Sequence, residues 1–196
     1  EKTEAENERW LLARRDVSLM VAGAAVAMMA PGCASSTTPD QDSAATASRK
    51  VSITTPDGTA DGFFVYPADG RHPAVILWPD IASLRPAYET MATRLAGAGY
   101  AVLVVNPYYR SARAPIFATF AEWRTEAGQA KTPPMRAALT TDAVTRDGAA
   151  FVGWLDVQAQ VDAARKIGTA GYCMGGSFAL RTAAARPERV GAVASF

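Results

Sequence analysis

The stretch RKIGTAGYCMGGSFALRTAAARP, residues 165–187, contains a strand-like segment, a glycine-rich turn and a helix that a proline stops. In the turn, Gly171 and Gly175 stand two residues to either side of Cys173. Between a strand and a helix, Gly-x-nucleophile-x-Gly forms the sharp elbow that presents a catalytic nucleophile. The bare pattern also arises as a buried cysteine in a glycine-rich turn. The flanking strand and helix favour the nucleophile.

The elements around this stretch predict the fold class. Strand-like segments at 50–55 and 62–67 are separated by turn formers, which indicates a hairpin. Continuous apolar runs at 73–79 and 100–107 are typical of buried strands. Helical spacing follows at 85–99 and at 139–158, with a loop expected between 107 and 139, and residues 189–196 begin a last strand. Alternating strands and helices predict an α/β fold, a doubly wound and mostly parallel sheet. We expect the sheet to be incomplete at its C-terminal end.

The N-terminal quarter of the chain, residues 1–48, differs from the rest in composition. Residues 1–33 contain Arg14-Arg15, a short apolar run over 17–30 and Pro-Gly-Cys-Ala, the parts of an export signal with a partial twin-arginine motif. Cys33 is a candidate lipid anchor, and cleavage after Ala34 is the alternative. We therefore expect an exported protein, periplasmic or lipoprotein-anchored. If the segment is instead an apolar helix, the protein is cytoplasmic. Residues 34–48 indicate a flexible linker, and 49–196 the folded domain.

Composition excludes several classes of function. The chain has 196 residues, of which 49% are hydrophobic and 20% charged, as in one globular domain. A net charge of +1 without a dense basic run gives no reason to expect nucleic acid as a partner. The two cysteines, Cys33 and Cys173, lie in regions of different character, which argues against a disulfide framework and a cysteine-based metal site. No metal is expected.

Two features of the turn would assist a thiol nucleophile. Cys173 would stand at the N-terminus of the following helix, where the positive end of the dipole favours a thiolate. The backbone N–H of Met174 would point to the same place and stabilise an oxyanion. The only histidine, His72, precedes the strand at 73–79 and so belongs at the opposite end of the parallel strands. We do not expect His72 to be catalytic.

From about residue 49 to 196 the sequence resembles the dienelactone hydrolases, also called carboxymethylenebutenolidases. The resemblance is carried by GYCMGG at 171–176, by the segment AVILWPDIASLRPAYETMATRLAGAGYAVLVVNPYYR at 74–110, and by the small-residue helix after the cysteine. It implies an α/β-hydrolase fold and hydrolysis of a lactone or related ester through an acyl-cysteine. The nucleophile of the family falls on Cys173 and its second oxyanion donor near Ile81. No organic cofactor or metal takes part in that mechanism.

The resemblance also suggests roles for residues after the neighbouring strands. The family has a glutamate that contacts the resting cysteine, and Asp80 stands in its place, one methylene shorter, as the candidate acid that tunes the thiol. An ordinary turn residue after the strand is the alternative for Asp80. The family binds an acidic lactone through arginines, so Arg110, Arg113 and Tyr109 are candidate substrate-binding residues. Solvated surface arginines are the alternative. Tyr108 either lines the pocket with Tyr109 or packs the loop, and we assign Trp123 and Trp154 to packing.

The aspartate and histidine of the family triad are expected beyond Phe196, so we expect little or no turnover from these 196 residues. A small-molecule ester or lactone, possibly an acidic one, is the expected partner. Two other functions fit the same residues. One is a non-catalytic relic that binds small molecules, and the other is a thioesterase or peptidase, since specificity depends on loops outside the elbow.

Overall fold

A computed structural model describes residues 45–196. The predicted export segment 1–33, with Cys33, and residues 34–44 of the predicted linker lie outside the described residues. The described part contains a six-stranded sheet of order β1-β2-β4-β3-β5-β6. No helix between residues 45 and 196 combines the length and the apolar character that a membrane crossing requires.

The sheet starts with an antiparallel hairpin at one edge. β1 (Thr46–Thr55) pairs with β2 (Gly58–Pro67) along its whole length, and β2 continues antiparallel onto β4 (Ala101–Val105). The predicted edge hairpin is therefore confirmed. Its first strand begins at Thr46, three residues before the boundary expected at Arg49, because Thr46, Ala47 and Ser48 pair with Pro67, Tyr66 and Val65.

The remaining strands run parallel, as predicted for βαβ units. β4, β3 (Ala74–Trp78), β5 (Ile167–Gly171) and β6 (Val190–Ser195) lie side by side in that order. Their side chains are mainly small, apolar or β-branched, and all five residues of β4 are buried. Such runs suit strands that helices cover on both faces. The doubly wound, mostly parallel α/β fold is thereby confirmed.

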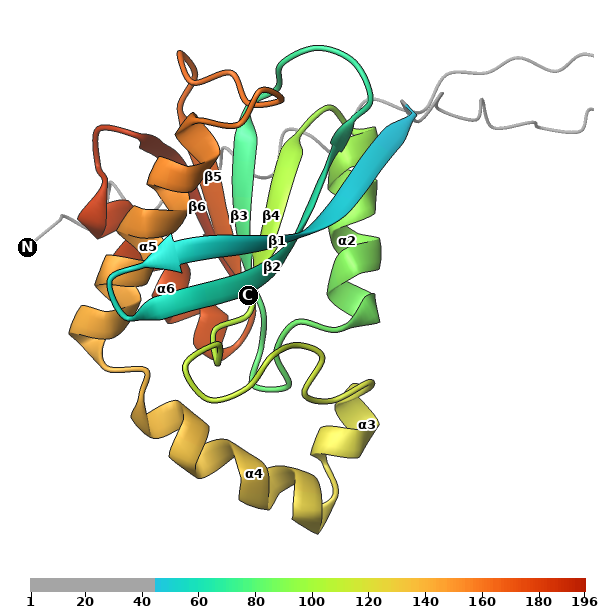
Figure 1. Ribbon diagram of the computed structural model, residues 1–196, viewed down its shortest axis with the longest axis vertical. Coiled ribbons are helices and arrows are strands. Elements are labelled where there is room, and N and C mark those ends of the chain that lie inside the picture. Colours follow the sequence, from blue (N-terminus) through green and yellow to red (C-terminus); the bar gives the residue numbers. More distant parts are fainter. Residues whose placement is uncertain (1–44) are drawn as a thin grey trace, which may run out of the picture. The chain divides into compact units, whose positions relative to one another are not determined.

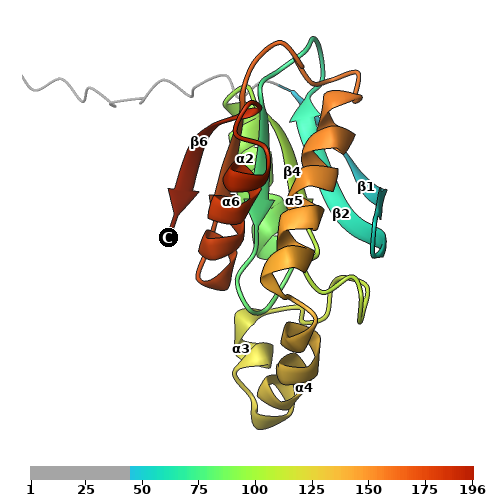
Figure 2. The same ribbon diagram turned by 90° about the vertical axis from the view of Figure 1, so that its left-hand side faces the viewer.

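Helices cover the two faces of the sheet (Figures 1 and 2). α5 (Thr141–Asp156) and α6 (Met174–Ala185) cover one face, where Phe64, Trp78 and Phe151 form part of a large buried cluster. α2 (Pro86–Gly97) covers part of the other face, and its Tyr88 and Ala92 pack on Leu77. On α5, Val144, Phe151 and Leu155 are buried, and Trp154, which we assigned to packing, is half-buried against Phe64.

The loop expected after β4 contains two helices, so that expectation was wrong. α3 (Phe120–Trp123) and α4 (Glu126–Ala137) form a small lobe at the carboxyl ends of the strands (Figure 1). The hydroxyl groups of Thr119 and Thr125 accept hydrogen bonds from N–H groups in the first turns of the two helices. The signal was masked by Pro133 and Pro134, which normally end a helix. Pro133 cannot donate to the Gln129 carbonyl, and the Thr132 hydroxyl does so at 3.0 Å.

Candidate active site

Cys173 lies on the turn between β5 and α6, in a backbone conformation that few side chains adopt. Its φ and ψ angles are 55° and −118°. A non-glycine residue at positive φ is strained, and such strain concentrates at functional sites. The residue is exposed at the carboxyl edge of the sheet, as the elbow interpretation requires.

The two glycines of the motif are needed because the backbone closes on itself. A Cβ on Gly175 would lie 2.5 Å from the carbonyl oxygens of both Trp78 and Pro79. A Cβ on Gly171 would overlap the backbone of Gly175. Neither position has space for a methyl group, because Gly175 lies against the end of β3 and Gly171 lies against Gly175 inside the turn.

Hydrogen bonds tie the turn to the strands on both sides. The Tyr172 N–H donates to the Trp78 carbonyl on β3 at 3.2 Å, and the Cys173 N–H donates to the Phe196 carbonyl at 2.8 Å. Inside the turn, the Gly175 N–H donates to the Tyr172 carbonyl at 2.9 Å, and the Gly176 N–H donates to that of Cys173 at 3.1 Å. The position of the thiol is therefore fixed by rigid elements rather than by a flexible loop.

The two residues whose N–H groups are predicted to bind an oxyanion both contact the side chain of one tyrosine, Tyr108. The hydroxyl of Tyr108 donates to the Ile81 carbonyl at 3.1 Å and lies 3.5 Å from the sulfur of Met174. It thus joins the loop after β3 to the first residue of α6. Among residues 45–196 we find no acceptor for the N–H of Ile81 or of Met174, so both donors remain available.

Tyr108 is buried, and burial raises its pKa above the ordinary value. The charge of Arg136 acts in the opposite direction, while the charges of Asp80 and of a Cys173 thiolate raise the pKa further. The phenol therefore stays protonated and can donate its hydrogen bond. Since the charge of Arg136 acts on the Tyr108 hydroxyl, this residue of α4 lies near the site. No pattern in the sequence indicated Arg136, because its helix α4 was expected to be a loop.

Asp80 forms an ion pair with Arg85, for which the sequence predicted no role. Its carboxylate forms two hydrogen bonds with Arg85, at 2.7 and 2.8 Å, and accepts a third from the Ala82 N–H at 2.9 Å. The Arg85 side chain is only 8% exposed and also lies over the Tyr88 ring. No hydrogen bond joins Asp80 to Cys173 in the described part of the chain, so the effect of Asp80 on the thiol stays a prediction. The only sequence signal for the ion pair of Asp80 is that an arginine, Arg85, stands five residues further along the chain.

Arg110 and Tyr109 lie in a polar network on the α5 side of the loop. The guanidinium of Arg110 bonds both carboxylate oxygens of Asp147 at 2.8 Å and one of Asp57 at 2.6 Å. The Tyr109 hydroxyl donates to Asp147 at 2.7 Å. Substrate binding stays a prediction for both residues, and their polar groups already have protein partners. Arg113 lies elsewhere, in a cleft beside β2.

The remaining expectations concern histidine, tryptophan and metal. His72 forms a bridge with Val161 just before β3, at the opposite edge of the sheet from Cys173, as expected. Trp123 is half-buried on α3 beside Phe120. The described residues contain no group of three or more His, Cys, Asp or Glu side chains that could hold a metal ion.

The mostly parallel sheet, with a strained, exposed cysteine on the turn between a strand and a helix, is typical of the α/β hydrolases. Comparison with known sequences agrees with this class. The model of the dienelactone hydrolase family matches residues 60–196, and the chain belongs to that family.

Individual relatives give the same result. A carboxymethylenebutenolidase of Rhodococcus opacus is 32% identical over 122 residues, which are 62% of this chain and 42% of that protein. The solved structure named m3DLH is 26% identical with a TM-score of 0.62, over 77% of this chain and 59% of its own. A dienelactone hydrolase-like promiscuous phosphotriesterase from metagenomic libraries is 25% identical with a TM-score of 0.58, over 78% and 59%. The chain thus spans less than two thirds of these relatives.

Proposed function

We propose that this chain carries the nucleophile and oxyanion hole of a cysteine hydrolase that acts on ester or lactone bonds. The observation that supports this most directly is the geometry of Cys173, which is exposed at φ 55° on an elbow fixed between β5 and α6. Cys173 is the N-cap residue of α6, two residues after the end of β5. The positive end of the helix dipole at this position favours a thiolate.

The reaction begins when the Cys173 sulfur attacks the carbonyl carbon of the substrate. The carbonyl oxygen becomes an oxyanion, which the free N–H groups of Met174 and Ile81 stabilise. The C–O bond then breaks, the alkoxide leaves with a proton, and the acyl group stays on sulfur as a thioester. Water hydrolyses the thioester and regenerates the thiol. These steps require a nucleophile, a base and donors, and no metal or cofactor.

A general base for the Cys173 thiol has not been identified among the described residues near the elbow. The sequence contains one histidine, and His72 lies at the far edge of the sheet. We propose that these 196 residues form the acyl-cysteine and release it slowly. Without a complete triad, the remaining acceleration over water is roughly 10³–10⁴-fold. Because Arg85 holds the Asp80 carboxylate, we propose that Asp80 influences the thiol through its charge and not through a direct hydrogen bond.

For the substrate we propose an ester or lactone with a carboxylate near the reacting carbonyl. Arg136 is the arginine that acts electrostatically on Tyr108, and no ion pair engages it among residues 45–196. Arg110, in contrast, is bound to two carboxylates. Arg136 is therefore the better candidate for holding an acidic group.

A burst experiment tests the nucleophile. The Cys33→Ser variant, in which Cys173 is the only cysteine, is mixed with 4-nitrophenyl acetate, and nitrophenolate release is followed with time. We expect a burst of one equivalent, a slow steady state, and one acetyl group on Cys173 by mass spectrometry. The Cys33→Ser/Cys173→Ala variant serves as the control and should show no burst. Acylation no faster than that of a free cysteine with a pKa of about 8.5 would contradict the proposal and favour a binding relic.

The acidic-substrate proposal is tested with two esters of similar size. The burst rate with 4-nitrophenyl hemisuccinate is compared with that of 4-nitrophenyl butyrate, in the protein with Arg136 and in Arg136→Gln. We expect the substitution to slow the acidic ester about tenfold, and the neutral ester little. Equal losses for both esters would contradict this assignment and leave the nucleophile untouched.

A further inference from the structure

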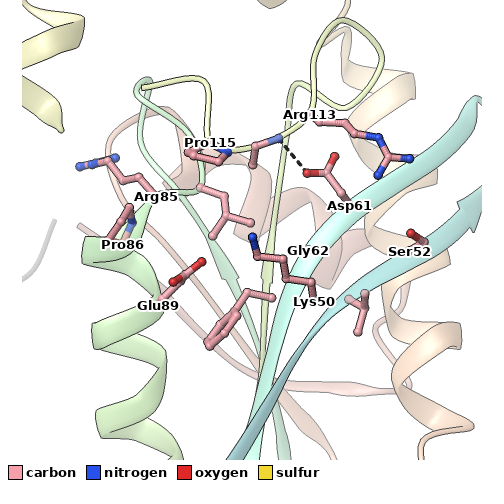
Figure 3. Close-up of a pocket in the computed structure, with 13 residues that line it drawn as sticks. Lys50, Ser52, Asp61, Gly62, Arg85, Pro86, Glu89, Arg113 and Pro115 are labelled. Atoms are coloured by element: carbon pink, nitrogen blue, oxygen red, sulfur yellow. Dashed lines mark hydrogen bonds between the residues drawn. The ribbon is translucent and has the colours of Figure 1, made fainter. Parts of the chain in front are cut away.

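A cleft of about 450 Å³ lies on the α2 side of the sheet, beside the hairpin. Its walls are the strands β1 and β2, the first turn of α2, and the loop 113–115 (Figure 3). Ligand sites of small molecules usually have roughly 300–1,000 Å³ and combine apolar walls with a few polar groups. The cleft has this size and composition, and nothing in the proposed hydrolase chemistry uses it.

The pairing of the hairpin decides which side chains reach the cleft. Lys50 stands opposite Phe63, and Ser52 opposite Asp61, so these four residues share one face of β1 and β2. Phe63 and the buried Leu84 provide an apolar surface below the polar groups. The same face thus offers apolar contact and charge together.

Two opposite charges point into the cleft from opposite walls. Figure 3 shows Lys50 of β1 and Glu89 of α2 extending into the cavity. No ion pair joins either side chain to another residue within 45–196. Both charges are therefore available to a ligand that brings the complementary groups.

Two other charged residues of the cleft, Asp61 and Arg85, already have partners. Asp61 accepts hydrogen bonds from Asn106 and from the Ala114 N–H at 2.9 and 2.8 Å, and Arg85 is bound to Asp80. In Figure 3 the Arg85 side chain points away from the cavity. The open positions for a ligand are thus Lys50 and Glu89, with Arg113 at the rim.

The cleft is separate from the elbow. None of residues 171–176 lines it, and Cys173 stands between β5 and α6, whereas the cleft borders β1, β2 and α2. A ligand there would not contact the thiol.

From this arrangement we infer that the cleft binds a small zwitterion, a molecule with a carboxylate for Lys50, an ammonium group for Glu89 and a short apolar body for Phe63 and Leu84. A simple anion would place negative charge near the Glu89 carboxylate, and a simple cation would place positive charge near the Lys50 ammonium group. A molecule with both charges satisfies both walls, and α-amino acids are the simplest members of this class.

Three probes of almost the same shape test the inference. L-leucine carries both charges, 4-methylpentanoate lacks the ammonium group, and 3-methylbutylamine lacks the carboxylate. Each is titrated into the ¹⁵N-labelled chain at millimolar concentrations, and the dissociation constant is taken from amide shifts of residues 50–52, 61–63 and 113–115. We expect L-leucine to bind at least about tenfold more tightly than either single-charge analogue, because each loses one charge-assisted contact.

Variants locate the two contacts. Lys50→Met keeps the apolar stem and removes the charge, and Glu89→Gln keeps the shape. Each should weaken L-leucine binding about tenfold. The matched controls are Lys131→Met and Glu126→Gln, which change exposed residues of α4 and should have no effect. Cys173→Ser should also bind normally, so the result does not depend on the hydrolase proposal.

Two outcomes would overturn the inference. The first is tighter binding of 4-methylpentanoate than of L-leucine, strengthened by Glu89→Gln, which would identify an anion site. The second is the absence of shifts in the cleft with all three probes, which would mean that Lys50 and Glu89 serve only solubility.

Discussion

The elbow at Cys173 and the loop that follows β4 occupy equivalent places, since both leave the carboxyl edge of a parallel strand. Their chemistry differs. The elbow is shaped by backbone contacts and two glycines, and its only reactive side chain is exposed. The β4 loop is shaped by its side chains, and Tyr109 and Arg110 are held by Asp147. At this edge the side chain of Cys173 is exposed because backbone contacts maintain the turn, whereas the polar groups of Tyr109 and Arg110 are engaged by Asp147.

The largest effect is expected where the β4 loop depends on a buried charge. The Asp147 side chain is 1% exposed and accepts three hydrogen bonds from Tyr109 and Arg110. Asp147→Ala leaves the Arg110 charge without its main partner and should lower the free energy of unfolding by about 3–5 kcal/mol. The measurement is urea unfolding. Asp142→Ala, an exposed aspartate at the start of the same helix, is the control, and an equal loss there would show that Asp147 has no special role.

At the elbow the sensitive atoms belong to the backbone. Gly175→Ala places a methyl group 2.5 Å from two carbonyl oxygens and should cost about 2–3 kcal/mol in unfolding free energy. The control is Gly153→Ala on α5, where nothing lies within 4 Å of the new methyl group. That substitution should stabilise the helix by up to about 1 kcal/mol. Similar results for the two glycines would remove the steric explanation of the motif.

Tyr108 connects the two regions, and its substitution should have a smaller effect. Tyr108→Phe removes the hydrogen bond to the Ile81 carbonyl and should cost about 1 kcal/mol. Tyr66→Phe is the control, because no hydrogen bond of the Tyr66 hydroxyl is found within residues 45–196. Thermal unfolding of both variants gives the comparison. If Tyr108→Phe is neutral while slowing acetylation of Cys173, Tyr108 acts on the site and not on stability.

The smallest effect on stability is expected at Asp57, the exposed aspartate that pairs with Arg110. Hydrogen bonds from Arg146 and Arg110 lower the pKa of Asp57 below its ordinary value of 3.8. Because the pKa in the folded protein is the lower one, the ionised carboxylate stabilises the fold above pH 3.8, and this contribution disappears as the pH falls further. Asp57→Asn should therefore lose less stability than the unmodified chain on acidification below that pH, measured by thermal unfolding. A steeper loss in the variant would reverse the assigned sign.

Much of the sheet could be predicted from the sequence because its signals are local. The apolar runs of β3 and β4 and the turn formers of the hairpin act within a few residues, and the predicted strands are present. The start of β1 was placed too late, since pairing with β2 extends a strand into Thr46–Ser48, a segment of linker-like composition. α4 was missed because Pro133 and Pro134 normally end a helix, and α3 was missed because its four residues are too few to show a helical period.

The candidate site also contains a part that could be predicted from the sequence and a part that could not. Cys173 and its glycines could be found because the elbow is one continuous motif whose geometry depends on Gly171 and Gly175. The partners of Asp80 and Arg110 could not be found from the sequence. Nothing in the sequence distinguishes Arg85, Asp57 and Asp147 from charged residues that face solvent. An arginine that binds a substrate and an arginine that binds an aspartate look identical in a sequence.

The sequence by itself determined the order of the strands, the doubly wound sheet and the position of the candidate nucleophile Cys173, since each rests on periodicity or on residues close together in the chain. Only the tertiary structure decided which charges are engaged and which are open. Arg110 meets Asp147 from 37 residues away, while Lys50 and Glu89 face a common cleft without pairing. Long-range contacts of this kind depend on how elements pack, and packing is a property of the whole fold rather than of any one segment.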